Sequence, residues 1–115
     1  MEPGKSDLVI YRGRTFRKTY VWKVNGVVQD LTGYTAKLQA RPFIDSSDVL
    51  FELTTENGGI VITTGVNSQI DLYISKSATS DYDFSVGIQD LCLINGDTIP
   101  FTYGKVTLIK TSTDG

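Results

Sequence analysis

The strongest constraint on the fold is an alternation of apolar and polar side chains along short segments that end at Asn-Gly turns. Within residues 15–24, the large apolar side chains recur on one side of an extended chain: Phe16, Tyr20, Trp22 and Val24. A period of two is typical of a strand with one buried side. Asn25 and Gly26 follow, and both residue types tolerate the positive φ of a tight hairpin. We therefore expect a hairpin here, with Trp22 in the core.

The same pattern predicts further strands, at residues 27–28, 35–41, 49–54, 60–62, 70–74, 86–94 and 101–110. Residues 43–48 are predicted to form a polar loop, and 76–83 one helical turn or an ordered loop. Seven or eight short strands with turn signals every 8 to 12 residues or so are typical of a sandwich or a small barrel. The sequence therefore predicts an all-β fold.

Length and composition fit one domain over residues 1–115, with 1–6 and 111–115 as flexible tails. The 40% apolar and 21% charged shares are those of an ordinary globule. No apolar run reaches the roughly 18 residues of a membrane span, and residues 1–7 lack a signal-peptide pattern. We expect the chain to be made and kept in a cytoplasm until an assembly step.

Several kinds of chemistry are disfavoured. The chain has no histidine, the commonest general base and zinc ligand. The single cysteine, Cys92, lies in an apolar run and is predicted to be a small buried side chain. The acidic pairs Asp45/Asp48 and Asp81/Asp83 lie in polar loops, where solvated carboxylates are more common than catalytic or calcium-binding ones. We expect no catalytic residue, metal or cofactor.

Positive charge is concentrated near the N-terminus. Residues 1–41 hold eight of the eleven Lys and Arg and three acids, although the whole chain has a net charge of −2. Such polarity can guide docking onto an acidic partner, and the candidate partner-binding residues are Arg12, Arg14, Arg17 and Lys18. The alternative is that neighbouring strands mix both signs and leave no patch.

Four segments carry a resemblance to a known family: Tyr11-Arg12-Gly13-Arg14-Thr15-Phe16, Asp30 to Arg41 with its Asp-Leu-Thr-Gly-Tyr-Thr-Ala start, Leu53 to Ile60, and the closing Gly104-Lys105-Val106-Thr107-Leu108. Together they resemble small structural proteins of tailed phages, over about Asp7 to Lys110. The sequence departs from that pattern near Asp81 to Ser85. The resemblance implies an immunoglobulin-like antiparallel β-sandwich of about seven to eight strands.

The resemblance also implies a function. We expect a non-enzymatic virion structural or adaptor protein, associated with the tail or baseplate. Its partners would be other phage structural proteins, bound in symmetric multiple copies through sheet faces or strand edges, with neither nucleic acid nor membrane as a partner. Two alternatives stay open: a capsid decoration (cement) protein, and a carbohydrate- or host-receptor-binding module.

Overall fold

The computed structural model describes residues 4–110, which form eleven strands and one short helix. Eight strands have four or more residues. The elements in chain order are β1 (Gly4–Lys5), β2 (Leu8–Tyr11), β3 (Phe16–Tyr20), β4 (Lys23–Val24), β5 (Val27–Val28), β6 (Thr35–Arg41), β7 (Phe51–Thr54), β8 (Ile60–Thr63), β9 (Gln69–Ile74), α1 (Lys76–Ser80), β10 (Val86–Asn95) and β11 (Asp97–Ile109). No helix in this part of the chain has the length and apolar character to cross a bilayer.

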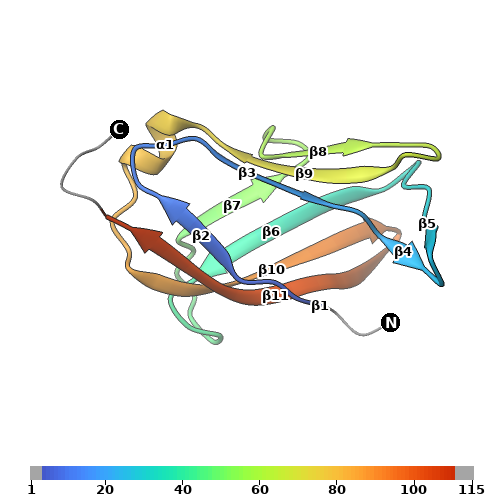
Figure 1. The fold of residues 1–115 in the computed structure, drawn as a ribbon. Coiled ribbons are helices and arrows are strands. Elements are labelled where there is room, and N and C mark those ends of the chain that lie inside the picture. The colour runs from blue at the N-terminus through green and yellow to red at the C-terminus, as the bar shows by residue number, and fades with distance from the viewer. Residues whose placement is uncertain (1–3, 111–115) are drawn as a thin grey trace.

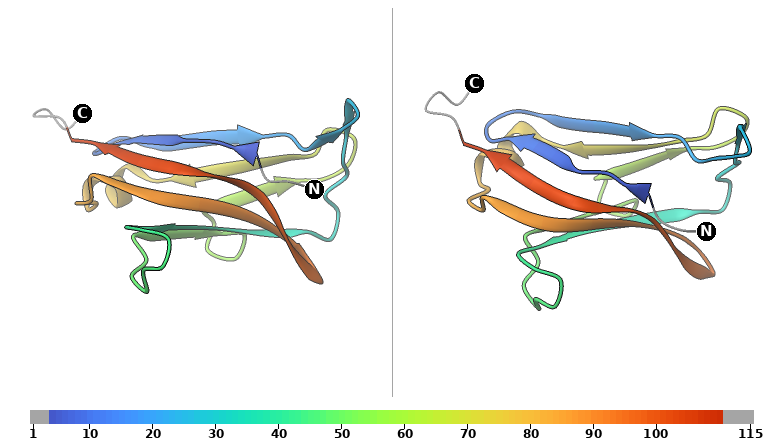
Figure 2. Two further views of the ribbon diagram at one scale, coloured as in Figure 1. Left: turned by 90° about the horizontal axis from the view of Figure 1, so that it is seen from below. Right: turned by 60° about the horizontal axis from the view of Figure 1, so that its bottom comes forward.

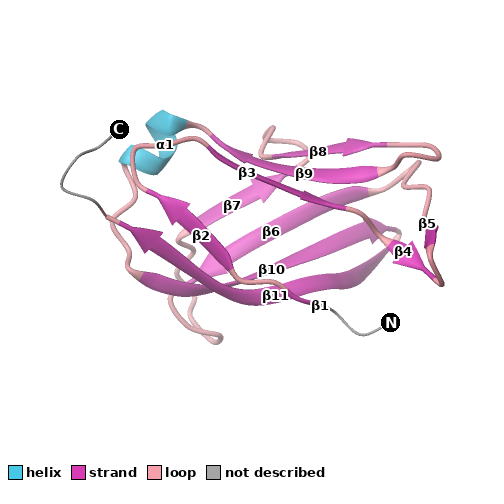
Figure 3. Cartoon of the chain, in the orientation of Figure 1, coloured by secondary structure: helices cyan, strands magenta, loops and turns pink. Residues whose placement is uncertain are grey.

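The strands form two layers that face each other (Figures 1 and 2). One layer is a six-stranded sheet in the order β1-β11-β10-β6-β7, with β2 also paired to β11. The other is a three-stranded sheet in the order β3-β9-β8, and β4 and β5 form a separate hairpin at one end. Strand and turn account for nearly all of the fold (Figure 3).

This strand order is that of an immunoglobulin-like sandwich. In that fold, one sheet joins the third, sixth and seventh strands (C, F and G), and the other joins the second, fifth and fourth (B, E and D). Here β6, β10 and β11 take the first set of places, and β3, β9 and β8 take the second. The predicted all-β immunoglobulin-like sandwich is confirmed. Most pairings are antiparallel as expected, but β1 and β2 pair with β11 in parallel.

The core lies between the layers and is built by the predicted alternation. Ala36, Leu38 and Ala40 of β6 are buried, as are Leu91 and Leu93 of β10. From the opposite sheet, every second residue of β9 points to the same interior: Ile70, Leu72 and Ile74. Burying apolar surface from both layers is the main favourable term in a fold of this kind.

An aromatic cluster closes one end of the core. Trp22 packs edge-on against Tyr34 and Phe101, with ring centroids 6.2 and 6.3 Å apart. Phe101 is the extra residue of a bulge in β11, since Thr102 pairs with Leu91 and Pro100 with Cys92. A bulge redirects the local side chains. Trp22 is a core anchor, as predicted, although it is only half-buried.

Several segments differ from the sequence prediction: β2 was not among the expected strands, and β11 begins at Asp97, before the expected residue 101. The strand expected over residues 15–24 is divided, because β3 ends at Tyr20 and the chain then enters the β4–β5 hairpin. The turn of that hairpin is as predicted, with φ of 52° at Asn25 and 80° at Gly26. Gly4–Lys5, which were expected to belong to a flexible tail at 1–6, form β1. Residues 1–3 and the expected tail at 111–115 lie outside the described residues.

Residues 76–83, for which a helical turn was one of two expectations, contain α1. The Ser75 side chain caps this helix by accepting a hydrogen bond from the Ala78 N–H at 3.2 Å. A serine at this position satisfies an amide that the first turn leaves free. Thr79, buried on the helix, donates to the Arg14 carbonyl at 2.7 Å and so fixes α1 to the turn between β2 and β3.

Candidate interaction surface

The outer face of the six-stranded sheet is built by side chains of several strands. Pairing register places its side chains in rows across the sheet. One row joins Lys105, Ile88 and Arg41, because Ile88 pairs with both of the others. The next row joins Lys5, Tyr103, Asp90, Gln39 and Glu52. Apolar, polar and charged groups are therefore mixed over five strands.

A groove of about 470 Å³ runs across these rows. Its apolar lining comes from Ile44, Ile88 and Tyr103. Its charged and polar lining comes from both ends of the chain as well as the middle: Lys5, Asp7, Gln39, Arg41, Asp90 and Lys105. Apolar contacts together with charged and polar ones are typical of a protein–protein interface.

The loop between β6 and β7 adds two exposed apolar side chains beside the groove. Phe43 is 63% exposed and Ile44 is 79% exposed. The loop is held by hydrogen bonds: Arg41 Nη1 donates to the Ser46 carbonyl at 2.7 Å, and the Ser46 N–H donates to the Phe43 carbonyl at 3.1 Å. Because these bonds fix the loop backbone before any partner arrives, the backbone of the loop would lose little conformational entropy on binding.

This loop was predicted to be polar, and that prediction was wrong for its first half. Phe43 and Ile44 follow Pro42, where β6 has just ended. Two large apolar residues immediately after a strand-ending proline were the sequence signal for an apolar segment in this loop.

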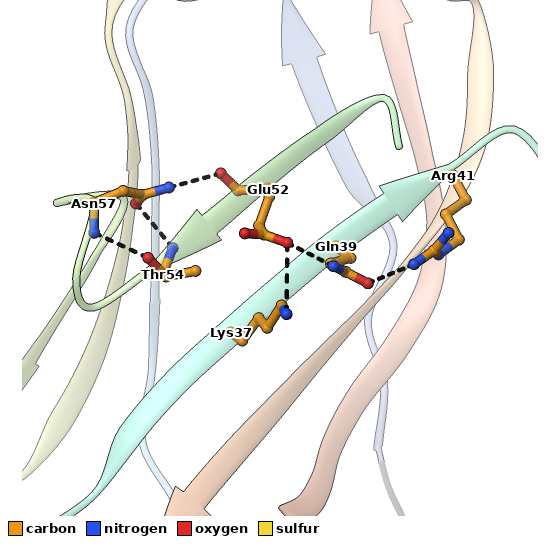
Figure 4. A network of polar contacts seen from close by, with 6 residues as sticks. All are labelled: Lys37, Gln39, Arg41, Glu52, Thr54 and Asn57. Carbon is orange, nitrogen blue, oxygen red and sulfur yellow. Dashed lines mark hydrogen bonds and ion pairs between the residues drawn. The ribbon is translucent and has the colours of Figure 1, made fainter. Parts of the chain in front are cut away.

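A chain of polar contacts stiffens one side of the surface (Figure 4). Arg41 Nη2 donates to Gln39 Oε1 at 2.7 Å, and Gln39 Nε2 in turn donates to Glu52 Oε2. Lys37 Nζ lies 3.6 Å from the same carboxylate. The hydrogen bond from Gln39, helped by the Lys37 charge, lowers the pKa of Glu52 below its ordinary value despite some burial. Glu52 is therefore a carboxylate at neutral pH, and the contact chain orients Arg41 toward the groove.

Cys92 lies on this outer face and is half-buried, so it is less buried than predicted. Burial, followed by the nearby Asp90 carboxylate, raises the pKa of the Cys92 thiol above its ordinary value, and Lys37 opposes this shift. A thiol with a raised pKa is mostly protonated at neutral pH and is a weak nucleophile. The raised pKa therefore disfavours a nucleophilic role for Cys92.

The four predicted partner-binding cations do not form one patch. Arg12 and Arg14 lie at the turn before β3, where Arg12 Nε donates to the Ser80 carbonyl at 3.3 Å. Arg17 points to the outer face of the three-stranded sheet, 4.8 Å from the centroid of the Tyr73 ring. Lys18 points to the opposite side of β3, 5.7 Å from the Tyr20 ring centroid. Their role in binding remains a prediction.

The acidic loop pairs show no metal-binding geometry. Among residues 4–110, no group of three or more Cys, Asp or Glu side chains gathers closely enough to hold a metal ion. Asp83 forms an ion pair with Lys110 at 3.3 Å, and the Asp48 N–H donates to the Ser46 hydroxyl at 3.0 Å. These residues contribute local contacts in their loops.

Comparison with known proteins gives fold neighbours alone. No family model matches the sequence, and no curated protein does. Among solved structures, the extracellular domain of the voltage-gated sodium channel beta4 subunit aligns at 11% identity and a TM-score of 0.48, covering 96% of both chains. A structure from photo-crosslinking work on sodium channel beta subunits aligns at 10% identity and 0.48, covering 95% of this chain and 93% of that one.

A third solved structure is an enzyme. An endo-fucoidan hydrolase aligns at 10% identity and a TM-score of 0.44, covering 93% of this chain and 13% of the hydrolase. At these identities and scores, none of the three bears on function. The assignment to an immunoglobulin-like sandwich rests on the strand order and pairing described above.

Proposed function

We propose that this chain is a non-enzymatic structural adaptor of a tailed-phage particle, associated with the tail or baseplate, and that it binds a larger virion protein through the outer face of the six-stranded sheet. The observation that carries the binding role is the groove lined by Ile44, Ile88 and Tyr103 together with Arg41 and Lys105. The phage assignment is supported by the sequence resemblance over Asp7 to Lys110.

The physical argument for binding is the way this surface is prepared. Phe43 and Ile44 expose apolar area on a loop that hydrogen bonds already hold, and Arg41 is oriented by Gln39 and Ser46. Aromatic, aliphatic and Arg side chains in a fixed arrangement dominate interface energies. A specific interface of ordinary size covers about 800 Å² per partner, an area that the outer face of several strands can supply.

The test is incorporation into assembled particles. The double variant Ile44→Asp, Ile88→Asp would place two charges among the apolar residues that line the groove. We expect at least about a tenfold drop in copies of the chain per particle, measured by quantitative mass spectrometry. The matched control is Val66→Asp, because Val66 is 86% exposed on the loop between β8 and β9 and lies outside the groove.

Each outcome discriminates between functions. Normal incorporation of the groove variant would contradict binding through this face. Absence of the wild-type chain from purified particles would contradict the virion role. Copies found on capsids and missing from tails would favour the decoration protein. Saturable binding of the pure domain to a glycan array would favour the receptor-binding module.

A further inference from the structure

The edge of β3 is open. β3 pairs with β9 alone, and its middle residues, Arg17 to Thr19, are exposed. In the described part of the chain, its backbone makes no hydrogen bond on the side away from β9. An immunoglobulin-type sheet has a first strand (A) next to this position. Here the first strands, β1 and β2, pair instead with β11 in the other sheet (Figure 1).

The side chains of this edge are apolar and cationic. Phe16, Lys18 and Tyr20 share the side of β3 that faces the other sheet, and Phe16 and Tyr20 pack against the core. Arg17 and Thr19 share the outer side. β3 itself has no acidic residue.

The acid nearest along the sheet is already engaged. Asp71 of β9 accepts a hydrogen bond from the Thr19 hydroxyl at 2.6 Å and from Gln69 Nε2 at 2.9 Å. At one end of the edge, the Tyr20 hydroxyl meets Ser6 Oγ at 2.7 Å and joins the two sheets. The charge presented along the open edge is therefore that of Arg17 and Lys18.

These charges oppose pairing of β3 with a second copy of itself. When two copies of β3 pair antiparallel with the centre of the pairing at residue 18, Lys18 lies directly opposite Lys18. When the centre moves to residue 17, Arg17 lies directly opposite Arg17. Like charges directly opposite each other in a sheet are destabilising. An inward-pointing lysine on an edge strand is also a known protection against edge-to-edge aggregation. A strand with carboxylates at these two positions would turn both repulsions into ion pairs.

We propose that β3 is a second binding site, which takes up an extended acidic segment of a partner protein by strand addition. The free backbone groups of β3 supply the hydrogen bonds, as in other cases of strand addition. Carboxylates of the added strand face Lys18 and Arg17, and apolar side chains face Phe16 and Tyr20. This site does not depend on the role proposed for the groove.

The register specifies a probe. A capped peptide with the core Val-Thr-Glu-Glu-Val, run antiparallel to β3, places Thr opposite Thr19, the two Glu opposite Lys18 and Arg17, and Val opposite Tyr20 and Phe16. Titration of the labelled protein at millimolar peptide should shift and protect the backbone amides of β3 in NMR spectra. The same peptide with Lys in place of both Glu should bind about tenfold more weakly or less.

Charge-reversed variants complete the test. Arg17→Glu with Lys18→Glu should lose the acidic peptide and gain the Lys peptide, a reversal that misfolding cannot produce. Lys76→Glu, at an exposed position on α1, is the matched control and should bind as the wild type does. Amide shifts confined to other strands, equal binding of both peptides, or no shift at millimolar acidic peptide would each overturn the proposal.

Discussion

Gly104 lies in β11 where the N-terminal segment crosses from β1 to β2. An added Cβ there would lie 2.5 Å from the Ser6 carbonyl oxygen and 2.8 Å from the Ser6 carbonyl carbon. The close approach allows the Gln89 side chain to donate to that carbonyl at 2.6 Å, and the Lys105 N–H to donate to the Asp7 carboxylate at 2.9 Å. A single residue thus decides whether the first strands can reach β11.

We expect Gly104→Ala to destabilise the fold by about 1–3 kcal/mol, because the clash is with backbone that cannot rotate away. The matched control is Gly4→Ala in the same segment, where a Cβ would meet no atom closer than 4.0 Å and should cost less than about 0.5 kcal/mol. Urea denaturation measures both free energies of unfolding. A wild-type midpoint for Gly104→Ala would show that β1 and β2 add little stability.

The turn between β5 and β6 shows how one short element joins distant parts of the chain. The Asp30 carboxylate accepts from the Thr32 hydroxyl at 2.7 Å and from the N–H groups of Thr32 and Gly65 at 3.0 Å each. Beside it, the Leu31 N–H donates to the buried Ser68 hydroxyl at 3.1 Å. The three hydrogen bonds to the Asp30 carboxylate hold the pKa of Asp30 below its ordinary value, and the bond from the Thr32 hydroxyl has the largest effect.

A pH dependence follows from this turn. Since the pKa of Asp30 is lower in the folded state, its contribution to stability is present above the ordinary carboxyl pKa and is lost as the pH falls through the folded value. We therefore expect the urea midpoint of the wild type to fall further than that of Asp30→Asn between about pH 5 and about pH 2. Parallel acid profiles of the two proteins would mean that the turn bonds do not depend on the charge.

The elements also show what the sequence could and could not predict. Alternation identified the buried residues of β6 and β9 correctly, because facing one core imposes a period of two locally. It could not predict the end of β3 at Tyr20, because that depends on the partner: β9 begins at Gln69, one residue beyond the pair of Tyr20 with Ile70. The length over which two strands pair depends on both strands, so the alternation within one segment cannot predict where its strand ends.

The candidate site was less predictable than the fold, for a related reason. Phe43 and Ile44 are large apolar residues in a segment expected to be a polar loop, and only the fold shows that Ile44 lines a groove on the sheet. The four cations lie within residues 12–18, yet strand alternation places Arg17 and Lys18 on opposite sides of β3. Spacing along the chain indicated positive charge and could not indicate which face carries it.

At the scale of the whole molecule, the two proposed binding surfaces belong to different sheets. The groove lies on the outer face of the six-stranded sheet, and the open edge belongs to the three-stranded sheet on the other side of the core (Figure 2). The residues lining the groove and the residues of β3 do not overlap. With both proposed sites in use, one copy of the chain would hold two partners at once, as a bridge does in a symmetric assembly.

Independence of the two surfaces gives a quantitative expectation. Sites without shared residues usually contribute additively, within about 0.5 kcal/mol. The Ile44→Asp, Ile88→Asp variant should therefore bind the acidic peptide as the wild type does. In particles, combining it with Arg17→Glu and Lys18→Glu should reduce copy number by the product of the separate reductions. The copy number of the four-substitution variant could instead fall no further than that of the more affected double variant. That result would mean that both surfaces contact one partner, across the edge near Ser6 and Tyr20, where a hydrogen bond joins the sheets.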